Sequence, residues 1–232
     1  MAKRPIVRVR GRGTPRYRAP SHRYLADWKY YFYSDKIYGL VKDIVHDPGR
    51  NPPMALIKLE DGREFYHVAP HGLKTGDVIS INGEPKLGSI LMLKDIPEGT
   101  KIYGLESFPG SGPRFARTSG SFAIILSKSD KTATVLLPSG KIKELDLRCR
   151  ASIGVPAGEG RHEKPFLKAG KKYHAMRARN RRWPMVSPTK MNAVDHPWGG
   201  TSKRPKYKLV HRTAPPGQKV GSVSPKRTGR KK

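Results

Sequence analysis

The sequence predicts an all-β protein in which two small barrels lie between long, basic, irregular N- and C-terminal extensions. Short apolar runs bounded by turn residues fill the middle of the chain, whereas Leu, Ile and Val thin out at both ends. Lys and Arg outnumber Asp and Glu by nine to two in residues 1–35 and by 21 to two in residues 161–232, but only by 17 to 14 in residues 36–160. Segments with so many like charges and so little apolar surface cannot form a core of their own.

The first barrel is expected in residues 36–85. Asp61-Gly62 lies between two apolar runs and is a strong hairpin signal. Several short strands within about 50 residues favour a small, strongly curved barrel. The predicted strands are Ile37–Val45, Met54–Leu59, Glu64–Val68 and Asp77–Ile81.

The second barrel is expected in residues 86–160. Apolar residues are nearly continuous in 121–126 and 132–137, which indicates strands buried on both faces or facing a barrel interior. Residues 108–117 are too rich in Gly and Pro for a strand and should form a loop. The predicted strands are Ile90–Leu93, Lys101–Leu105, Phe122–Ser127, Thr132–Leu137, Ile142–Leu145 and Ala151–Val155.

The two extensions, residues 1–35 and 161–232, contain few elements that could form regular structure. The chain up to about Tyr33 reads as a solvated leader in which arginines alternate with Gly and Pro. One short helix is expected around Lys171–Arg179, and the prolines that follow forbid longer elements. The free extensions should therefore become ordered only on a polyanion.

The formal net charge of +29 indicates a densely anionic partner. A membrane surface is disfavoured, because the extensions lack an amphipathic helix with a wide apolar face and no apolar run is long enough to span a bilayer. DNA compaction stays open as an alternative, but aromatic residues inside the basic run, and barrels in place of a groove-entering helix, favour RNA. Cys149 is the single cysteine, which fits a reducing cytoplasm.

Lys171 to Trp183 is the clearest candidate for an RNA-binding segment. Its bases can neutralise phosphates, while its Tyr, His and Trp side chains can stack on unpaired bases. Taken with the arginines of the leader, the central loop and the tail, the residues expected to bind RNA are Arg8, Arg10, Arg12, Arg16, Arg18, His22, Arg23, Arg114, Arg117, Lys171, Lys172, His174, Arg177, Arg179, Arg181, Arg182, Trp183, Asn192, Asp195, His196, Trp198, Gly199, Gly200, Lys226, Arg227 and Arg230.

Asp195-His196 invites a catalytic interpretation, in which a carboxylate orients an imidazole base. Adjacent residues of an extended chain point to opposite sides, however, and no Ser or Cys is placed as an obvious nucleophile. We therefore expect no catalytic residue, and a turn at His196 that contacts RNA, with Asp195 accepting from backbone amides and Gly199 and Gly200 permitting close backbone approach. An enzyme that uses His196 remains the alternative.

A dedicated metal site is not expected. His46, His67 and His71 lack cysteines or a fourth ligand for zinc. Gly110, Gly112 and Gly120 do not form a nucleotide-binding fingerprint. The only cofactor considered is Mg²⁺ held jointly by RNA and a carboxylate such as Asp195.

Several motifs resemble the universal large-subunit ribosomal protein family L-two in its archaeal form. The matching segments run nearly from end to end, in the same order and at fitting spacings. They are Arg18 to Tyr24, His46-Asp47-Pro48, Ile96 to Gly99, Lys168 to Lys171, Met191 to Gly200 and Lys226 to Arg230.

The resemblance implies an oligonucleotide-binding-like barrel followed by an SH3-like barrel, with extensions that thread large-subunit rRNA near the peptidyl transferase centre. It implies a primary rRNA-binding protein that supports subunit association, tRNA binding and peptide-bond formation. It also implies neighbouring ribosomal proteins and contact with small-subunit rRNA as partners, no homo-oligomer, no membrane, and a cytoplasmic location in the large subunit. A catalytic role once proposed for the histidine matching His196 is not carried over, since the chemistry is regarded as that of RNA.

Two departures from the family pattern lie near His196. Residues 187–190 read Ser-Pro-Thr-Lys where members commonly have Arg-Gly-Val-Ala, and Thr201 replaces a usual third glycine. The resemblance therefore says less about the path of the loop around His196 than about the rest of the chain.

Overall fold

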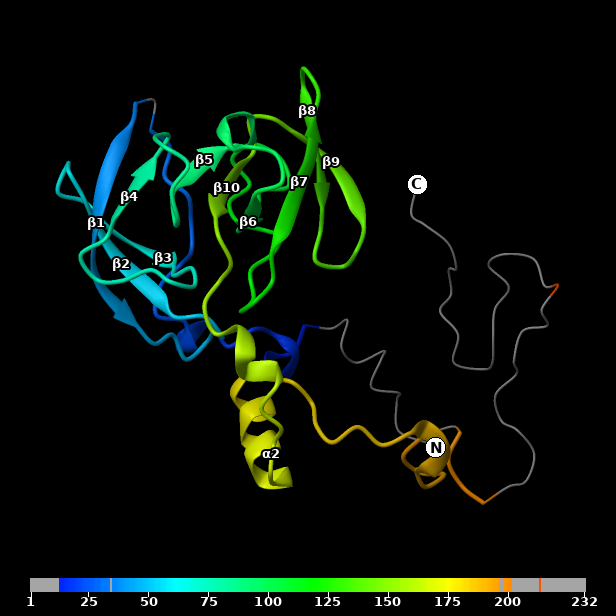
Figure 1. Cartoon of the computed structure of the whole chain (residues 1–232). Helices are drawn as coiled ribbons and strands as arrows, with labels where there is room; N and C mark the ends of the chain where they lie inside the picture. Colours follow the sequence, from blue (N-terminus) through cyan, green and yellow to red (C-terminus); the bar gives the residue numbers. More distant parts are fainter. Residues whose placement is uncertain (1–12, 34, 197, 202–212, 214–232) are drawn as a thin grey trace. The chain divides into compact units, whose positions relative to one another are not determined.

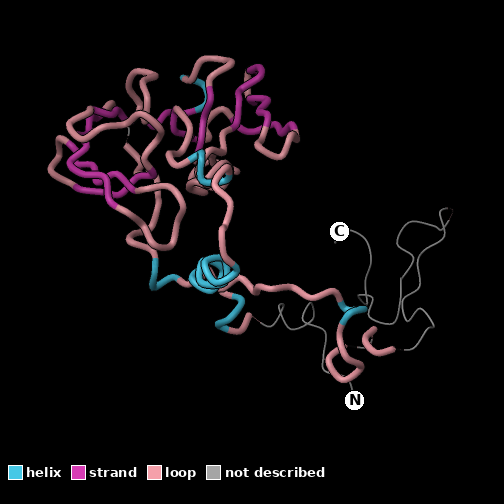
Figure 2. The backbone as a smooth tube through the Cα atoms, turned by 60° about the horizontal axis from the view of Figure 1, so that its bottom comes forward, coloured by secondary structure: helices cyan, strands magenta, loops and turns pink. Residues whose placement is uncertain are grey.

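The computed structural model describes residues 13–33, 35–196, 198–201 and 213. It divides into two units. Pro20–Phe166 forms one, which we call the core unit. The described residues before Pro20 and after Phe166 form the other, which we call the extension unit. All strands of the described chain lie in the core unit, whereas the extension unit contains helical turns, one α-helix and loops (Figure 2).

Ten strands form one sheet in the order β3-β2-β1-β4-β5-β10-β6-β7-β8-β9 (Figure 1). A single parallel pair, Ile81 with Ile90, joins β4 to β5, and every other pairing is antiparallel. The sheet therefore consists of two antiparallel parts, each with a core of its own. The strands are β1 Ile37–Val45, β2 Met54–Leu59, β3 Glu64–Val68, β4 Val78–Ile81, β5 Ile90–Met92, β6 Lys101–Tyr103, β7 Ala123–Lys128, β8 Thr132–Leu136, β9 Ile142–Asp146 and β10 Arg150–Ile153.

The first part, β1 to β4, has the oligonucleotide-binding-like character that was predicted. The β2–β3 hairpin turns at Asp61-Gly62, where Gly62 has φ of 85°. The register of β1 against β2 shifts between Val41 and Asp43, and such a bulge bends a strand and helps to curl a sheet. Its buried core consists of Tyr30, Val41, Ala55, Ile57, Leu59, Phe65, Ala69, Ile79, Ile81 and Ile90.

The second part, β5 to β10, is the SH3-like domain. Burial alternates along β8, where Ala133 and Val135 are buried. In β7 the exposed Leu126 lies at a second register shift. The expectation of strands buried on both faces is therefore wrong, and the barrel-interior alternative describes these strands. The core residues are Leu91, Leu93, Ile96, Ile102, Leu105, Ala123, Ile125, Ala133, Val135, Leu145, Cys149, Ala151 and Ile153.

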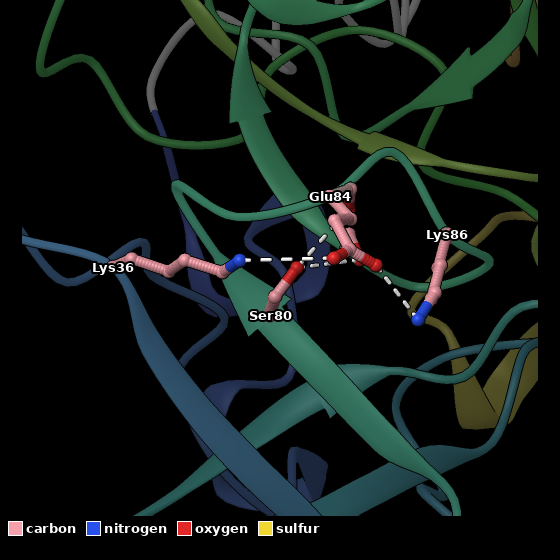
Figure 3. Close-up of polar contacts among 5 residues, drawn as sticks. Lys36, Ser80, Glu84 and Lys86 are labelled. Carbon is pink, nitrogen blue, oxygen red and sulfur yellow. Dashed lines mark hydrogen bonds and ion pairs between the residues drawn. The ribbon is translucent and has the colours of Figure 1, made fainter.

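The loop between β4 and β5 is fixed by polar contacts around Glu84 (Figure 3). Its carboxylate pairs with Lys86 at 2.8 Å and with Lys36 at 3.9 Å, and its carbonyl accepts from Ser80 at 3.1 Å. The hydrogen bond from Lys86 is the main reason that the pKa of Glu84 is lowered. The lysine pairs are exposed, so they orient the loop more than they stabilise the fold.

The sequence predicted a solvated leader up to about Tyr33, and this prediction is wrong for its last part. Trp28 and Tyr30 are each only 5% exposed. Tyr30 belongs to the core of the first part, yet its hydroxyl donates to the carbonyl of Gly104 at 2.8 Å and lies 2.9 Å from Ser152 Oγ in the second part. Residues 28–30, which we call the strap, therefore bind the two parts of the sheet together.

A buried polar network surrounds the strap. Trp28 Nε1 donates to His67 Nδ1 at 3.1 Å, so the proton of the neutral imidazole lies on Nε2, which faces Tyr103 Oη at 3.0 Å and Ser152 Oγ at 3.1 Å. Tyr103 in turn donates to the carbonyl of Val68 at 2.8 Å. Burial lowers the pKa of His67 to about 3 and raises that of Tyr103. His67 is therefore a structural hydrogen-bonding residue of the core.

Candidate nucleic-acid interface

Basic side chains of the core unit are supported by aromatic rings. The Arg117 guanidinium lies 5.6 Å from the centre of the Trp28 ring, and that of Arg50 lies 4.8 Å from the centre of the Tyr24 ring. The pKa of Arg117 is lowered, first by partial burial and then by the charges of Arg50 and Arg114. Arg50 is ion-paired with the buried carboxylate of Asp47, so the positive potential that can attract a phosphate at this surface comes from Arg114 and Arg117.

The loop that carries Arg114 and Arg117 is held by a buried carboxylate. Glu106 is fully buried and accepts the backbone N–H groups of Gly110 at 3.3 Å, Gly112 at 2.9 Å and Arg150 at 3.0 Å. These bonds satisfy the charge of Glu106 and fix the Gly- and Pro-rich segment on the barrel. The predicted loop is present, and its two arginines rest on a rigid base.

In the extension unit, helix α2 spans Ala169–Ala178 (Figure 1). At 100° per residue, its bases Lys171, Lys172 and Arg177 are spread around the helix axis. None of its ten residues, all of which are described, is buried. The prediction placed the helix two residues later at its start and one residue later at its end. A helix of this length without a packed face is only marginally stable in water.

The segment after α2 turns back onto it. Asn180 adopts a left-handed φ of 50°, and the N–H of Arg181 donates to the carbonyl of Met176 at 2.8 Å. This turn brings the Trp183 ring under the ammonium of Lys172, which lies 5.5 Å from the ring centre. Basic and aromatic groups that are consecutive in the sequence thus meet on one side of the helix end.

The N-terminal end of the chain meets the same region. The Asn180 side-chain amide donates to the carbonyl of Pro15 at 3.3 Å and to that of Arg18 at 3.1 Å. These bonds hold the 3-10 turn Pro15–Tyr17, and with it Arg16, beside the end of α2. A pocket of about 520 Å³ results, and its lining consists of Pro15, Arg16, Tyr173, Arg177, Asn180, Arg181, Arg182 and Trp183.

The loop around His196 forms a tight turn rather than extended chain. The N–H groups of Asp195 and His196 both donate to the carbonyl of Asn192, at 3.0 and 3.3 Å, and the N–H of Gly200 donates to that of Met191 at 2.9 Å. His196 is only 8% exposed. Its Nδ1 accepts the backbone N–H of Trp198 at 3.1 Å, so the neighbouring carboxylate is not the group that orients this nitrogen.

Gly199 is required by this turn. A Cβ at that position would lie 2.3 Å from the carbonyl oxygen of Asn192 and 2.4 Å from that of Met191. The close backbone approach expected at the glycine pair is therefore made to the chain's own backbone, with Gly200 at a φ of 100°. The accepting role predicted for the Asp195 carboxylate, and joint Mg²⁺ binding there, remain predictions.

The structure thus distributes the predicted RNA-binding residues over three places. Arg16, Arg177, Arg181, Arg182 and Trp183 line the pocket, Arg114 and Arg117 lie on the core unit, and Asn192 to Gly200 form the His196 loop. His22 and Arg23 lie in an exposed 3-10 turn, Ser21–Arg23, of the core unit. Arg18 is exposed, and its carbonyl accepts a hydrogen bond from the side chain of Asn180. Lys171, Lys172 and His174 lie in α2, and Arg179 follows it directly. Arg8, Arg10, Arg12, Lys226, Arg227 and Arg230 fall outside the described residues.

Several residues with a role in these surfaces were absent from the predicted set. Tyr173 and Asn180 belong to the pocket, and Tyr24 and Arg50 form a cation–π pair on the core unit. Tyr173 was recognisable as part of the basic-aromatic run. Asn180, Tyr24 and Arg50 act through contacts with residues that are distant in sequence, and such contacts have no local signal.

Comparison with known proteins identifies the family. The model described as "Ribosomal Proteins L2, RNA binding N-terminal domain" matches residues 5–81, and "Ribosomal Proteins L2, C-terminal domain" matches residues 86–219. The large ribosomal subunit protein uL2 of Archaeoglobus fulgidus is 50% identical over 234 residues, which cover 99% of each chain. The protein of the same name from Haloarcula marismortui is 48% identical over 99% of this chain and 98% of its own.

The chain belongs to the ribosomal protein L2 family. The predicted resemblance is thereby confirmed, and the match extends over the basic ends as well as the barrels. Residues 82–85, between the two L2 family models, lie in the loop around Glu84 that leads from β4 to β5. The L2 family is one of structural ribosomal proteins and not a class of enzyme.

No helix in the described part of this L2 family member is long and apolar enough to cross a membrane.

Proposed function

We propose that the chain is a structural constituent of the large ribosomal subunit, in which it binds rRNA. The observation that carries this function is the unburied helix α2 within a segment of 21 bases and two acids. An element with no packed face and a high positive charge is stabilised by a polyanion rather than by its own chain. The relatives are named as large ribosomal subunit proteins, and the N-terminal family model is described as RNA binding.

The two units contribute differently to this function. The core unit supplies a rigid platform on which Arg117 rests against Trp28, with Arg114 in the same loop. The extension unit loses conformational entropy when it becomes ordered on rRNA, and release of counterions from the phosphates offsets that loss. In the finer proposal the extensions thread rRNA near the peptidyl transferase centre of cytoplasmic ribosomes. There they support subunit association, tRNA binding and peptide-bond formation beside neighbouring ribosomal proteins and small-subunit rRNA.

His196 acts in this proposal as part of a folded loop and not as a catalyst. Its imidazole is buried, and one nitrogen already accepts the N–H of Trp198. The ring lies 5.5 Å from that of Trp198 in an edge-on arrangement, which adds to the packing of the loop. Replacement by Gln should leave peptidyl transfer by assembled particles within a few-fold of normal. A thousandfold loss would show that the enzymatic alternative is right.

The RNA preference is tested by competition on the full chain. Labelled large-subunit rRNA is bound at several salt concentrations and challenged with unlabelled rRNA or with duplex DNA of equal nucleotide content. We expect rRNA to compete far better at 0.2 M salt, because the aromatic groups and the preformed surfaces suit folded, partly unpaired RNA. Equal competition by duplex DNA would instead support a general nucleic-acid-compacting protein.

A further inference from the structure

The pocket of the extension unit combines charge and shape in a way that a mere basic surface does not. Four of its eight lining residues are arginines, namely Arg16, Arg177, Arg181 and Arg182. Asn180 adds a polar side chain, and the lining, which consists wholly of described residues, includes no carboxylate. Its volume of about 520 Å³ lies within the range of pockets that hold small organic ligands. A solvated run of charges would repel and separate, whereas these four arginines line one hollow.

Two aromatic residues make the pocket suited to a flat ring as well as to an anion. Tyr173 is 44% exposed, and Trp183 is only partly covered, by Lys172 at 5.5 Å from its ring centre. Both residues line the pocket. Indole and phenol rings stack on nucleobases of any sequence, and guanidinium groups pair with phosphate through two parallel hydrogen bonds.

We propose that this pocket holds a single unpaired nucleotide of rRNA, with its base stacked on Trp183 or Tyr173 and its phosphate paired with the arginines. The inference rests on the proposed rRNA-binding function and makes it specific. A free phosphate or an acidic peptide would pair with the arginines but has no flat ring that could stack on Trp183 or Tyr173. A paired base within a duplex could not leave its stack to enter the pocket without first being unpaired.

Segments from before and after the core unit are both needed to form this site. Arg16 comes from the turn Pro15–Tyr17, Arg177 lies in α2, and Arg181 and Arg182 follow the helix. The Asn180 amide joins the two segments through the carbonyls of Pro15 and Arg18. Asn180 is therefore a positioning residue. Its replacement by Ala should weaken binding to unpaired RNA as removal of Arg16 does, although Asn180 carries no charge.

Two variants of the full chain separate stacking from charge. Trp183→Ala should weaken binding of large-subunit rRNA about tenfold without changing the dependence on salt, because stacking releases no counterions. Arg177→Ala should reduce the slope of log affinity against log salt by about 0.7, as expected for one lost phosphate contact. Trp183→Phe keeps a flat ring and should retain most of the affinity. Phe166→Ala removes an aromatic side chain that is 53% exposed and lies outside the pocket, so it should change nothing.

The choice of RNA tests the unpaired nucleotide directly. The tenfold loss in Trp183→Ala should appear with rRNA and with a single-stranded oligoribonucleotide, but not with fully paired duplex RNA. The inference is overturned if this variant binds rRNA as tightly as the unsubstituted chain, or if it loses affinity equally for duplex RNA. It is overturned as well if a poly-glutamate peptide binds the chain in a Trp183-dependent way. Failure of the unsubstituted chain to bind rRNA would instead refute the proposed function.

Discussion

The core unit and helix α2 of the extension unit are ordered by opposite means. Met54, Ile57 and Ile81 in the core unit are completely buried, and residues 36–160 carry 17 bases against 14 acids. Helix α2 has no buried residue and lies in a segment with 21 bases against two acids. Burial of apolar surface can hold the first in shape by itself. The second has hydrogen bonds within its backbone but buries none of its side chains within the described chain, so we expect a polyanion to stabilise it.

The largest effect is expected when the basic C-terminal segment is removed. Deletion of residues 161–232 should leave the β signal in circular dichroism and the thermal transition of the barrels intact. It should weaken rRNA binding by about a thousandfold or more at 0.2 M salt, since most phosphate contacts are lost. Filter binding across salt concentrations measures the effect. Undiminished affinity in the shortened chain would show that the core unit alone is the rRNA-binding part.

Replacement of a methionine by alanine should affect stability differently in the core unit and in the extension unit. Met54 is completely buried, whereas Met185 in the extension unit is 70% exposed. Met54→Ala should lower the free energy of unfolding by about 2–5 kcal/mol because it leaves a cavity, whereas Met185→Ala should change it by less than about 0.5 kcal/mol. Chemical denaturation followed by tryptophan fluorescence compares the two. Equal effects would contradict the assignment of stability to the core unit.

Acid should destabilise the core unit through His67. Its pKa is lowered to about 3 in the folded chain by burial, against an ordinary value of 6.5, so between these values the unfolded chain binds more protons. The contribution of neutral His67 to the free energy of unfolding is therefore fully present above about pH 6.5. It is lost as the pH drops toward 3, and the free energy of unfolding should fall by about 2–3 kcal/mol between pH 7 and 4.5.

The matched variant for this effect is His67→Gln, which cannot titrate. Its stability will be lower at pH 7 because hydrogen bonds to Trp28 and Tyr103 are altered. Its decline between pH 7 and 4.5 should nevertheless be smaller than that of the unsubstituted chain. Parallel declines in the two proteins would mean that His67 is not the group responsible.

The smallest expected effect on global stability comes from the His196 loop. Gly199→Ala forces a Cβ against two carbonyl oxygens, so the turn must open, and amides of residues 191–200 should exchange faster. Gly170→Ala, in α2, meets nothing within 4 Å and should strengthen the helix slightly. Neither should shift the melting of the barrels. A lowered melting temperature in Gly199→Ala would indicate that the loop supports the core unit.

The sequence predicted the strands well because their signals are local. The hairpin signal of Asp61-Gly62 and the short apolar runs that became strands depend on residues that are neighbours in the chain. The strap was missed because the whole leader was judged by the arginines, Gly and Pro of residues 8–20. Trp28 is buried by contacts with His67 and Tyr103, which are distant in sequence. Composition describes the average of a segment, whereas two aromatic residues are enough to anchor it.

The sequence predicted a basic and aromatic surface at the candidate site, but it did not predict the pocket. The alternation of bases and aromatics from Lys171 to Trp183 predicts an RNA-binding surface. The pocket depends on a hydrogen bond from Asn180 to Pro15, 165 positions away, and such a pairing has no signature in either segment. The left-handed φ of Asn180, which lets Arg181 turn back to Met176, is likewise a property of the folded turn.

Hydrogen exchange of the full chain, free and bound to large-subunit rRNA, tests the contrast most directly. Amides of β2 and β7 should exchange slowly in both states, whereas those of α2 should exchange quickly in the free chain and become protected in the complex. The contradicting result is an α2 whose amides are as protected as those of β2 without RNA and unchanged by its addition.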